Sequence, residues 1–103
     1  MSKRVESVYL LDMLTYARRV RERVGARTRE ELEQDDEARE SVAFNLMVIG
    51  EAAAQVSDAT RQAHPEVPWP KIGYDRIDFE KVWEAVTSGI PALIQSLEQI
   101  LPR

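Results

Sequence analysis

The sequence predicts an all-α protein, an up-and-down helical bundle that forms a homodimer. Apolar residues recur with helical spacing in three long segments, near residues 5–24, 36–57 and 79–101. Residues suited to capping helices stand at the boundaries of these segments. No stretch alternates apolar and polar residues for long enough to form a useful strand. At this length we expect a single domain, residues 1–103.

The first predicted helix covers residues 5–24, with Ser2 as a possible cap. Its apolar stripe consists of Tyr9, Leu10, Met13, Leu14, Tyr16, Ala17 and Val20. Gly25 follows the last turn, where a glycine commonly ends a helix. Thr28 and Glu31 then have the spacing of a capping box, which predicts a short helical turn.

The second predicted helix covers residues 36–57 and can be capped by Asp35 or Asp36. One apolar stripe consists of Val42, Leu46, Ile49, Ala53 and Val56, and an adjacent face carries Phe44, Met47 and Ala54. Because so much of its circumference is apolar, we expect this helix to be central and to touch more than one neighbour. Gly50 lies inside it, and a close helix crossing would account for that choice. A short helix to Ala63 follows, capped by Ser57 or Asp58.

Three prolines, Pro65, Pro68 and Pro70, predict an extended connection, after which Asp78 can cap a last helix at residues 79–101. Its apolar seam consists of Phe79, Val82, Val86, Ile90, Leu93, Leu97 and Ile100. Pro91 interrupts this seam and predicts a kink at Ser88–Gly89. Three seams exceed the needs of a small monomer, so we expect the 36–57 and 79–101 helices to form a homodimer interface.

Composition limits the possible functions. The chain has no cysteine, which excludes a disulfide framework, a thiol nucleophile and a cysteine-ligated zinc. No apolar window is long enough to span a membrane, and the first residues lack the apolar run of a signal peptide. We therefore expect a cytoplasmic protein with no membrane partner. The sequence also contains neither a metal-binding constellation nor a glycine-rich phosphate loop, so we expect no metal and no cofactor.

Charge is unevenly distributed along a chain of net charge −4. Six arginines fall within twelve residues: Arg18, Arg19, Arg21, Arg23, Arg27 and Arg29. A dense acidic run follows between Glu30 and Glu40. One interpretation is a solvated helix end followed by a solvated helix start, which helix dipoles favour at both places. The other is a local basic patch that faces RNA or an acidic partner.

Two short patterns relate the chain to a known family. Pro68-Trp69 precedes Gly73-Tyr74 and then Val82-Trp83, and an earlier segment runs from Asn45 through Ile49-Gly50-Glu51-Ala52. Their order and spacing resemble the HepT-like proteins, a branch of the HEPN (higher eukaryotes and prokaryotes nucleotide-binding) helical domains.

This resemblance implies a toxin of a toxin–antitoxin pair, a metal-independent endoribonuclease whose site lies at a dimer interface. Relatives carry Arg-Asn, four to six residues, then His-x-Tyr, after the Pro-Trp pair. Their histidine acts as general acid and base, and their arginine stabilises charge on the phosphate. A nucleotidyltransferase antitoxin of the MntA type adenylylates the tyrosine, and Tyr74 matches that position.

The chain departs from this pattern where the chemistry lies. Ile72 runs directly into Gly73, as if about two helical turns with the Arg-Asn and the histidine were missing. Natural degeneration, a detoxifying deletion or a segment missing from the sequence would each produce this. The one histidine, His64, precedes Pro65, and we interpret it as an exposed residue at a helix end. We therefore assign no catalytic residue from the family motif, and name Glu51 as the candidate for a relocated base.

Other residues admit two interpretations each. Asn45 and Glu51 either line the interface cleft or serve the structure, Asn45 through a buried hydrogen bond and Glu51 by pairing with an arginine. Trp69 and Trp83 fit core anchors better than platforms for stacking bases. Tyr74 is either an adenylylation acceptor or an ordinary loop tyrosine.

Two functions follow. The first is a HepT-like toxin component whose lineage substrate is RNA and which is inactive in this chain because the catalytic segment is absent. The alternative is a non-enzymatic helical dimeric binding module for a nucleotidyltransferase partner. An in-frame Arg-Asn…His segment in the encoding DNA between Ile72 and Gly73 would restore the enzyme hypothesis.

Overall fold

The computed structural model describes residues 3–67, 69 and 79–101, and this part of the chain is helical with no strand. The elements in chain order are α1 (Lys3–Val24), α2 (Arg29–Gln34), α3 (Asp36–Ala54), α4 (Asp58–Ala63), α5 (Phe79–Glu84), the π-helical turn η2 (Ala85–Gly89) and α6 (Ile90–Ile100). The all-α prediction is confirmed for these residues.

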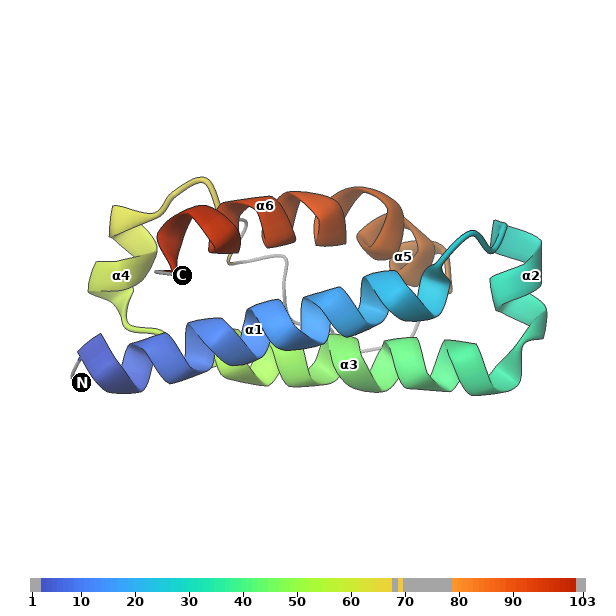
Figure 1. The fold of residues 1–103 in the computed structure, drawn as a ribbon, viewed down its shortest axis with the longest axis horizontal. Helices are drawn as coiled ribbons and strands as arrows, with labels where there is room; N and C mark the ends of the chain where they lie inside the picture. Colours follow the sequence, from blue (N-terminus) through green and yellow to red (C-terminus); the bar gives the residue numbers. More distant parts are fainter. Residues whose placement is uncertain (1–2, 68, 70–78, 102–103) are drawn as a thin grey trace.

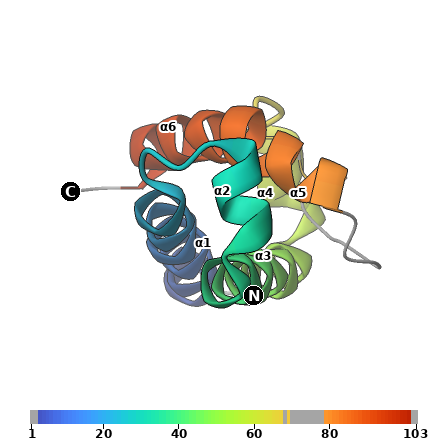
Figure 2. The ribbon, with the colours of Figure 1, turned by 90° about the vertical axis from the view of Figure 1, so that its right-hand side faces the viewer.

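Three long helical segments lie side by side (Figure 1). α1 runs in one direction, and α3 and the α5–η2–α6 segment run in the other. α2 closes one end of the bundle, as the end-on view in Figure 2 shows, and α4 lies at the opposite end. The predicted up-and-down order therefore holds for α1 and α3, whereas the third segment is parallel to α3.

The central helix is α1, which packs against both α3 and α6. The prediction that residues 36–57 form the central helix is wrong for the single chain. α3 buries one face against α1, but Phe44 and Met47 on its outer face are 60% and 51% exposed. The periodicity of apolar residues shows which faces of a helix can be buried. The packing of the bundle decides which of these faces contacts another helix.

The buried core follows the predicted stripes closely. Its α1 members are Leu10, Met13, Leu14, Ala17 and Val20, with Tyr9 and Tyr16 at its edge. α3 contributes Ala38, Val42, Leu46, Ile49, Ala52 and Ala53. The third segment contributes Val82, Val86, Ile90, Leu93, Ile94 and Leu97. None of the helices formed by the described residues is sufficiently long and apolar for a membrane span.

The predicted caps have the expected geometry. Thr28 and Glu31 form a complete capping box at the start of α2. Asp35 is the cap of α3 and accepts a hydrogen bond from the Ala38 backbone N–H at 3.1 Å. Ser57 caps α4 with an extended backbone. That role ends α3 earlier than the predicted residue 57, because a capping residue cannot also continue the preceding helix.

The predicted kink in the last helix is a π-helical turn. The Ile90 backbone N–H donates to the carbonyl of Ala85, five residues earlier. Pro91 follows and has no N–H to give to the carbonyl of Thr87, so a regular α-helical bond is missing at this point. The Thr87 hydroxyl donates to the Trp83 carbonyl at 2.8 Å. The irregularity begins earlier than Ser88–Gly89, because Pro91 disturbs the preceding turn.

Glu6 joins the first helix to the fourth. Its side chain is 9% exposed and accepts hydrogen bonds from the Ser57 backbone N–H, at 2.7 Å, and from the Thr60 hydroxyl. Arg61 of α4 donates to the carbonyl of Ala53 at 2.7 Å. These contacts fix α4 to the adjoining ends of α1 and α3.

Candidate functional site

A pocket of about 590 Å³ lies between the second half of α1 and the first half of α3. Its lining residues are Arg19, Glu22, Arg23, Ser41 and Asn45. α1 and α3 run in opposite directions, so the end of one helix lies beside the start of the other. This topology brings together residues that are about twenty positions apart in the sequence.

Helical spacing explains which side chains meet there. Arg19 and Arg23 are four residues apart on α1, and Ser41 and Asn45 are four residues apart on α3. Residues with this spacing lie on the same face of a helix. Glu22 lies between the two arginines and supplies a negative charge. The site therefore combines two cations, one carboxylate and two neutral hydrogen-bonding side chains.

Asn45 is the buried member of this group, with 6% of its surface exposed. Its amide nitrogen donates to the Ser41 carbonyl at 2.8 Å and lies 3.5 Å from the Ser41 hydroxyl. A buried asparagine must satisfy its amide, and this local bond to the preceding turn does so. The side chain is therefore held in a fixed position at the pocket wall.

The arginine cluster divides into two groups. Arg18 pairs with Glu98 at 2.6 Å, and Arg27 pairs with Asp35 at 3.2 Å. Arg19 and Arg23 form no ion pair with a carboxylate in the part of the chain that the structure describes.

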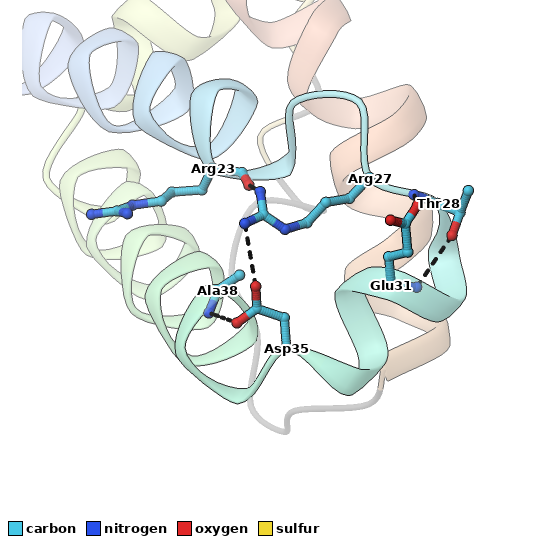
Figure 3. A network of polar contacts seen from close by, with 6 residues as sticks. All are labelled: Arg23, Arg27, Thr28, Glu31, Asp35 and Ala38. Atoms are coloured by element: carbon cyan, nitrogen blue, oxygen red, sulfur yellow. Dashed lines mark hydrogen bonds and ion pairs between the residues drawn. The ribbon is translucent and has the colours of Figure 1, made fainter.

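Figure 3 shows the pairing at the end of α1. Arg27 donates to both the Arg23 carbonyl and the Asp35 carboxylate, whereas the Arg23 side chain extends away from this network. Arg19 instead places its guanidinium over the Tyr16 ring, 4.6 Å from the ring centre. Arg19 and Arg23 line the pocket, whereas Arg21, which also has no carboxylate partner among the described residues, lies outside it.

Glu51 and Asn45 occupy different sides of α3. Glu51 is exposed and lies six positions after buried Asn45, which corresponds to an angle of about 120° around the helix axis. Glu51 makes no ion pair with an arginine among the described residues. An interface cleft that includes both residues stays a prediction.

His64 ends α4 as its C-cap, as expected for a helix-end histidine. It is only partly exposed, because its ring nitrogen Nδ1 lies 3.4 Å from a Glu66 carboxylate oxygen and 32% of the side chain is accessible. The expectation of an exposed residue is therefore wrong, because His64 is half-buried. The Trp69 indole N–H donates to the His64 carbonyl at 3.0 Å. Trp69 and Trp83 pack against the core, as predicted.

Several predicted features lie outside the described residues, among them Tyr74, the Ile72–Gly73 junction and the Asp78 cap. Within the described residues, no group of three histidine or acidic side chains is placed to hold a metal ion. The described residues of the pocket lining include no group that normally titrates near neutral pH. Its side chains are suited to holding a negatively charged group rather than to exchanging protons.

Sequence reasoning did not identify this pocket. It identified Asn45 and the arginine cluster separately, but it did not indicate a functional role for Ser41 or Glu22. The spacing of Arg19 with Arg23 and of Ser41 with Asn45 would have shown two polar faces. The antiparallel pairing that joins those faces is a property of the tertiary structure.

The model of the family described as "Ribonuclease HepT-like" matches residues 13–100. The chain belongs to the HepT-like family. A protein of Methanocaldococcus jannaschii named "Putative RNase" is 26% identical over 110 residues, which cover 98% of this chain and 91% of that protein. A "Probable ribonuclease HepT" of Thermococcus cleftensis is 28% identical over 64 residues, covering 53% and 58% of the two chains. No solved structure matches the chain.

The alignment with the Methanocaldococcus protein extends over 110 positions, which is more than the 103 residues of this chain. The archaeal protein therefore contains residues for which this chain has no counterpart.

Proposed function

We propose that the chain is the HepT-like component of a toxin–antitoxin pair, derived from a metal-independent endoribonuclease, and that it has lost most or all of its RNA-cleaving activity. The observation that carries the proposal is the family match over residues 13–100 in a chain whose one histidine is His64. That histidine precedes the Pro68-Trp69 pair, whereas the histidine of HepT-like proteins follows it.

The environment of His64 further supports the loss of activity. It lies next to Glu66 and the Trp69 indole, at the end of a helix whose position is fixed through Glu6 and Arg61. It has the surroundings of a structural residue. The unmatched residues of the archaeal relative are consistent with a deletion in this chain.

The test is incubation of the purified protein with transfer RNA or total RNA in the presence of a chelator. Loss of a general acid–base histidine lowers the rate by about 10²–10⁴-fold, so we expect cleavage at that reduced level or none. A matched variant has Arg-Asn, four residues and His inserted between Ile72 and Gly73, so that the new histidine, Gly73 and Tyr74 form His-x-Tyr. We expect the insertion to restore cleavage, and replacement of its histidine by alanine to abolish it again.

One result would contradict this proposal directly. Strong cleavage by the unmodified chain that disappears in Glu51→Ala, and persists in His64→Ala, would show that the catalytic site has moved to α3.

We also propose that the chain acts as a homodimer. The supporting observation is the outer face of α3, where Phe44 and Met47 are largely exposed. Burying such side chains is the main driving force of association between helices. The second candidate function is a non-enzymatic dimeric module that binds a nucleotidyltransferase. Such a module would use the same surface, so the exposed apolar residues support it as well as they support the toxin component.

The proposed partner is a nucleotidyltransferase antitoxin, with Tyr74 as the acceptor of AMP. The Tyr74 hydroxyl would attack the α-phosphate of ATP, displacing pyrophosphate, with the partner supplying the metal and the base. We expect weak modification, because the residues that set the direction of this tyrosine in relatives are missing here. Mixing the chain with a cognate transferase, ATP and Mg²⁺, followed by mass spectrometry, tests this. AMP on Tyr9 or Tyr16 and none on Tyr74 would refute the assignment.

A further inference from the structure

We propose that the pocket between α1 and α3 binds the phosphate of a ribonucleotide, either free or within RNA. Arg19 and Arg23 hold the phosphate, and Ser41 and Asn45 form the opposite wall. The inference that RNA is one source of this ligand rests on the proposed function. Among the described residues that line the pocket, Asn45 also belongs to the pattern that resembles the HepT-like family. The other lining residues lie outside that pattern.

The charge distribution is the first argument. Arg19 and Arg23 face the same pocket without a carboxylate partner among the described residues, whereas the nearby Arg18 and Arg27 each have one. Two unpaired positive charges that line one pocket favour the binding of an oxyanion there. Guanidinium groups also match phosphate oxygens with paired hydrogen bonds.

The fixed position of Asn45 is the second argument. Asparagine is uncommon at fully buried sites. Here it is 6% exposed and anchored to Ser41, so its amide loses little freedom when a ligand binds. The Ser41 hydroxyl and the Asn45 amide supply directional hydrogen bonds beside the cationic wall. A surface that contacts only solvent does not require a buried amide, so the position of Asn45 supports a ligand site.

An aromatic contact of Arg19 adds a planar surface next to the pocket lining, which suits a nucleotide as well as a simple anion. The Arg19 guanidinium lies 4.6 Å from the centre of the Tyr16 ring. Planar arginine and tyrosine side chains are surfaces on which unpaired bases stack. The pocket has a volume of about 590 Å³ and is open to solvent, so it is accessible to a free nucleotide and to RNA.

Glu22 allows a test in which removing a charge should strengthen ligand binding. Among the residues that the structure describes, it is the one carboxylate that lines this pocket, and it repels a bound phosphate. Glu22→Gln removes the negative charge and retains the side-chain size. We therefore expect this variant to bind phosphate ligands more tightly than the unmodified chain.

The experiment measures the binding of AMP, adenosine and a short unstructured oligo-uridine to the full chain at one fixed salt concentration. Arg19→Gln and Arg23→Gln should each weaken AMP and RNA binding by about three- to tenfold. Arg21→Gln is the matched control, because it removes the same charge from an exposed position of α1 outside the pocket. Adenosine, which lacks the phosphate, should bind more weakly than AMP.

The outcomes separate the possible sources of the phosphate. Binding of AMP but not RNA identifies a free nucleotide, and binding of RNA but not AMP identifies the polymer. Equal losses in Arg21→Gln and the two pocket variants, no binding of either probe, or weaker binding in Glu22→Gln would overturn the proposal. Circular dichroism of each variant establishes that its helices are intact.

The cleavage assay described above is independent of this result. Binding without cleavage supports both proposals. Binding together with strong cleavage by the unmodified chain refutes the loss of activity and leaves the phosphate pocket supported.

Discussion

At the scale of single residues, Glu6 shows how tertiary contacts change the chemistry of a side chain. Hydrogen bonds from the Ser57 and Thr60 side chains and from the Ser57 backbone lower the pKa of its carboxyl from 4.5 to about 2. These donors stabilise the ionised form, because hydrogen bonds to a charged carboxylate are stronger than those to a neutral carboxyl.

This pKa shift predicts how stability changes with pH. The folded pKa lies below the unfolded value, so the stabilisation by Glu6 is complete above about pH 4.5 and is lost as the pH falls towards about 2. Glu6→Gln should therefore lower the free energy of unfolding at neutral pH, and the difference from the unmodified chain should shrink across this window. Urea denaturation of both proteins over a pH series measures it. A difference that stays constant with pH would contradict the prediction.

At the scale of elements, the ends of the helices are set by local chemistry. Gly25 follows α1 with a φ angle of 52°, and its N–H donates to the Arg21 carbonyl at 2.9 Å. Gly89 has right-handed helical angles, φ −69° and ψ −49°, and a Cβ added there would meet no atom within 4 Å. Gly25 therefore has a backbone conformation that favours glycine, whereas Gly89 has one that alanine adopts readily.

The corresponding alanine substitutions should have opposite effects. Gly25→Ala forces a Cβ into the left-handed region and should destabilise the chain by about 1–2 kcal/mol. Gly89→Ala reduces the freedom of the unfolded chain without strain and should stabilise by about 0.4–1 kcal/mol. Chemical denaturation of the pair measures both changes. The same sign for both variants would show that their backbone angles do not decide their contributions.

At the scale of the whole molecule, the exposed apolar face of α3 bears on assembly. Phe44 and Met47 lie on one face of the helix and away from the core. Val8 of α1 is 53% exposed but belongs to neither helix expected at the interface. These residues allow the proposed homodimer to be tested without disturbing the bundle.

We expect Phe44→Lys and Met47→Lys to shift the chain from dimer to monomer, because each places a charge in an apolar interface. Val8→Lys is the matched control and should leave the dimer unchanged. Sedimentation at micromolar concentration measures the mass, and circular dichroism monitors the helices. A stable monomer of the unmodified chain, or equal effects of all three substitutions, would count against the proposed interface.

The sequence by itself determined the helical class, most of the core and the caps. Thr28 with Glu31, Asp35 and Ser57 act within one turn of their own position, so local spacing is sufficient to identify them. The apolar stripe from Leu10 to Val20 follows equally from helical periodicity.

The tertiary structure alone decided what depends on contacts between distant residues. It made α1 the central helix, placed Glu6 against the start of α4, and set Arg19 and Arg23 opposite Ser41 and Asn45. Periodicity defines the faces of a helix but not which neighbour covers each face, because that choice depends on the packing of the whole bundle. The candidate phosphate pocket exists because antiparallel pairing joins two polar faces whose sequences contain no shared motif.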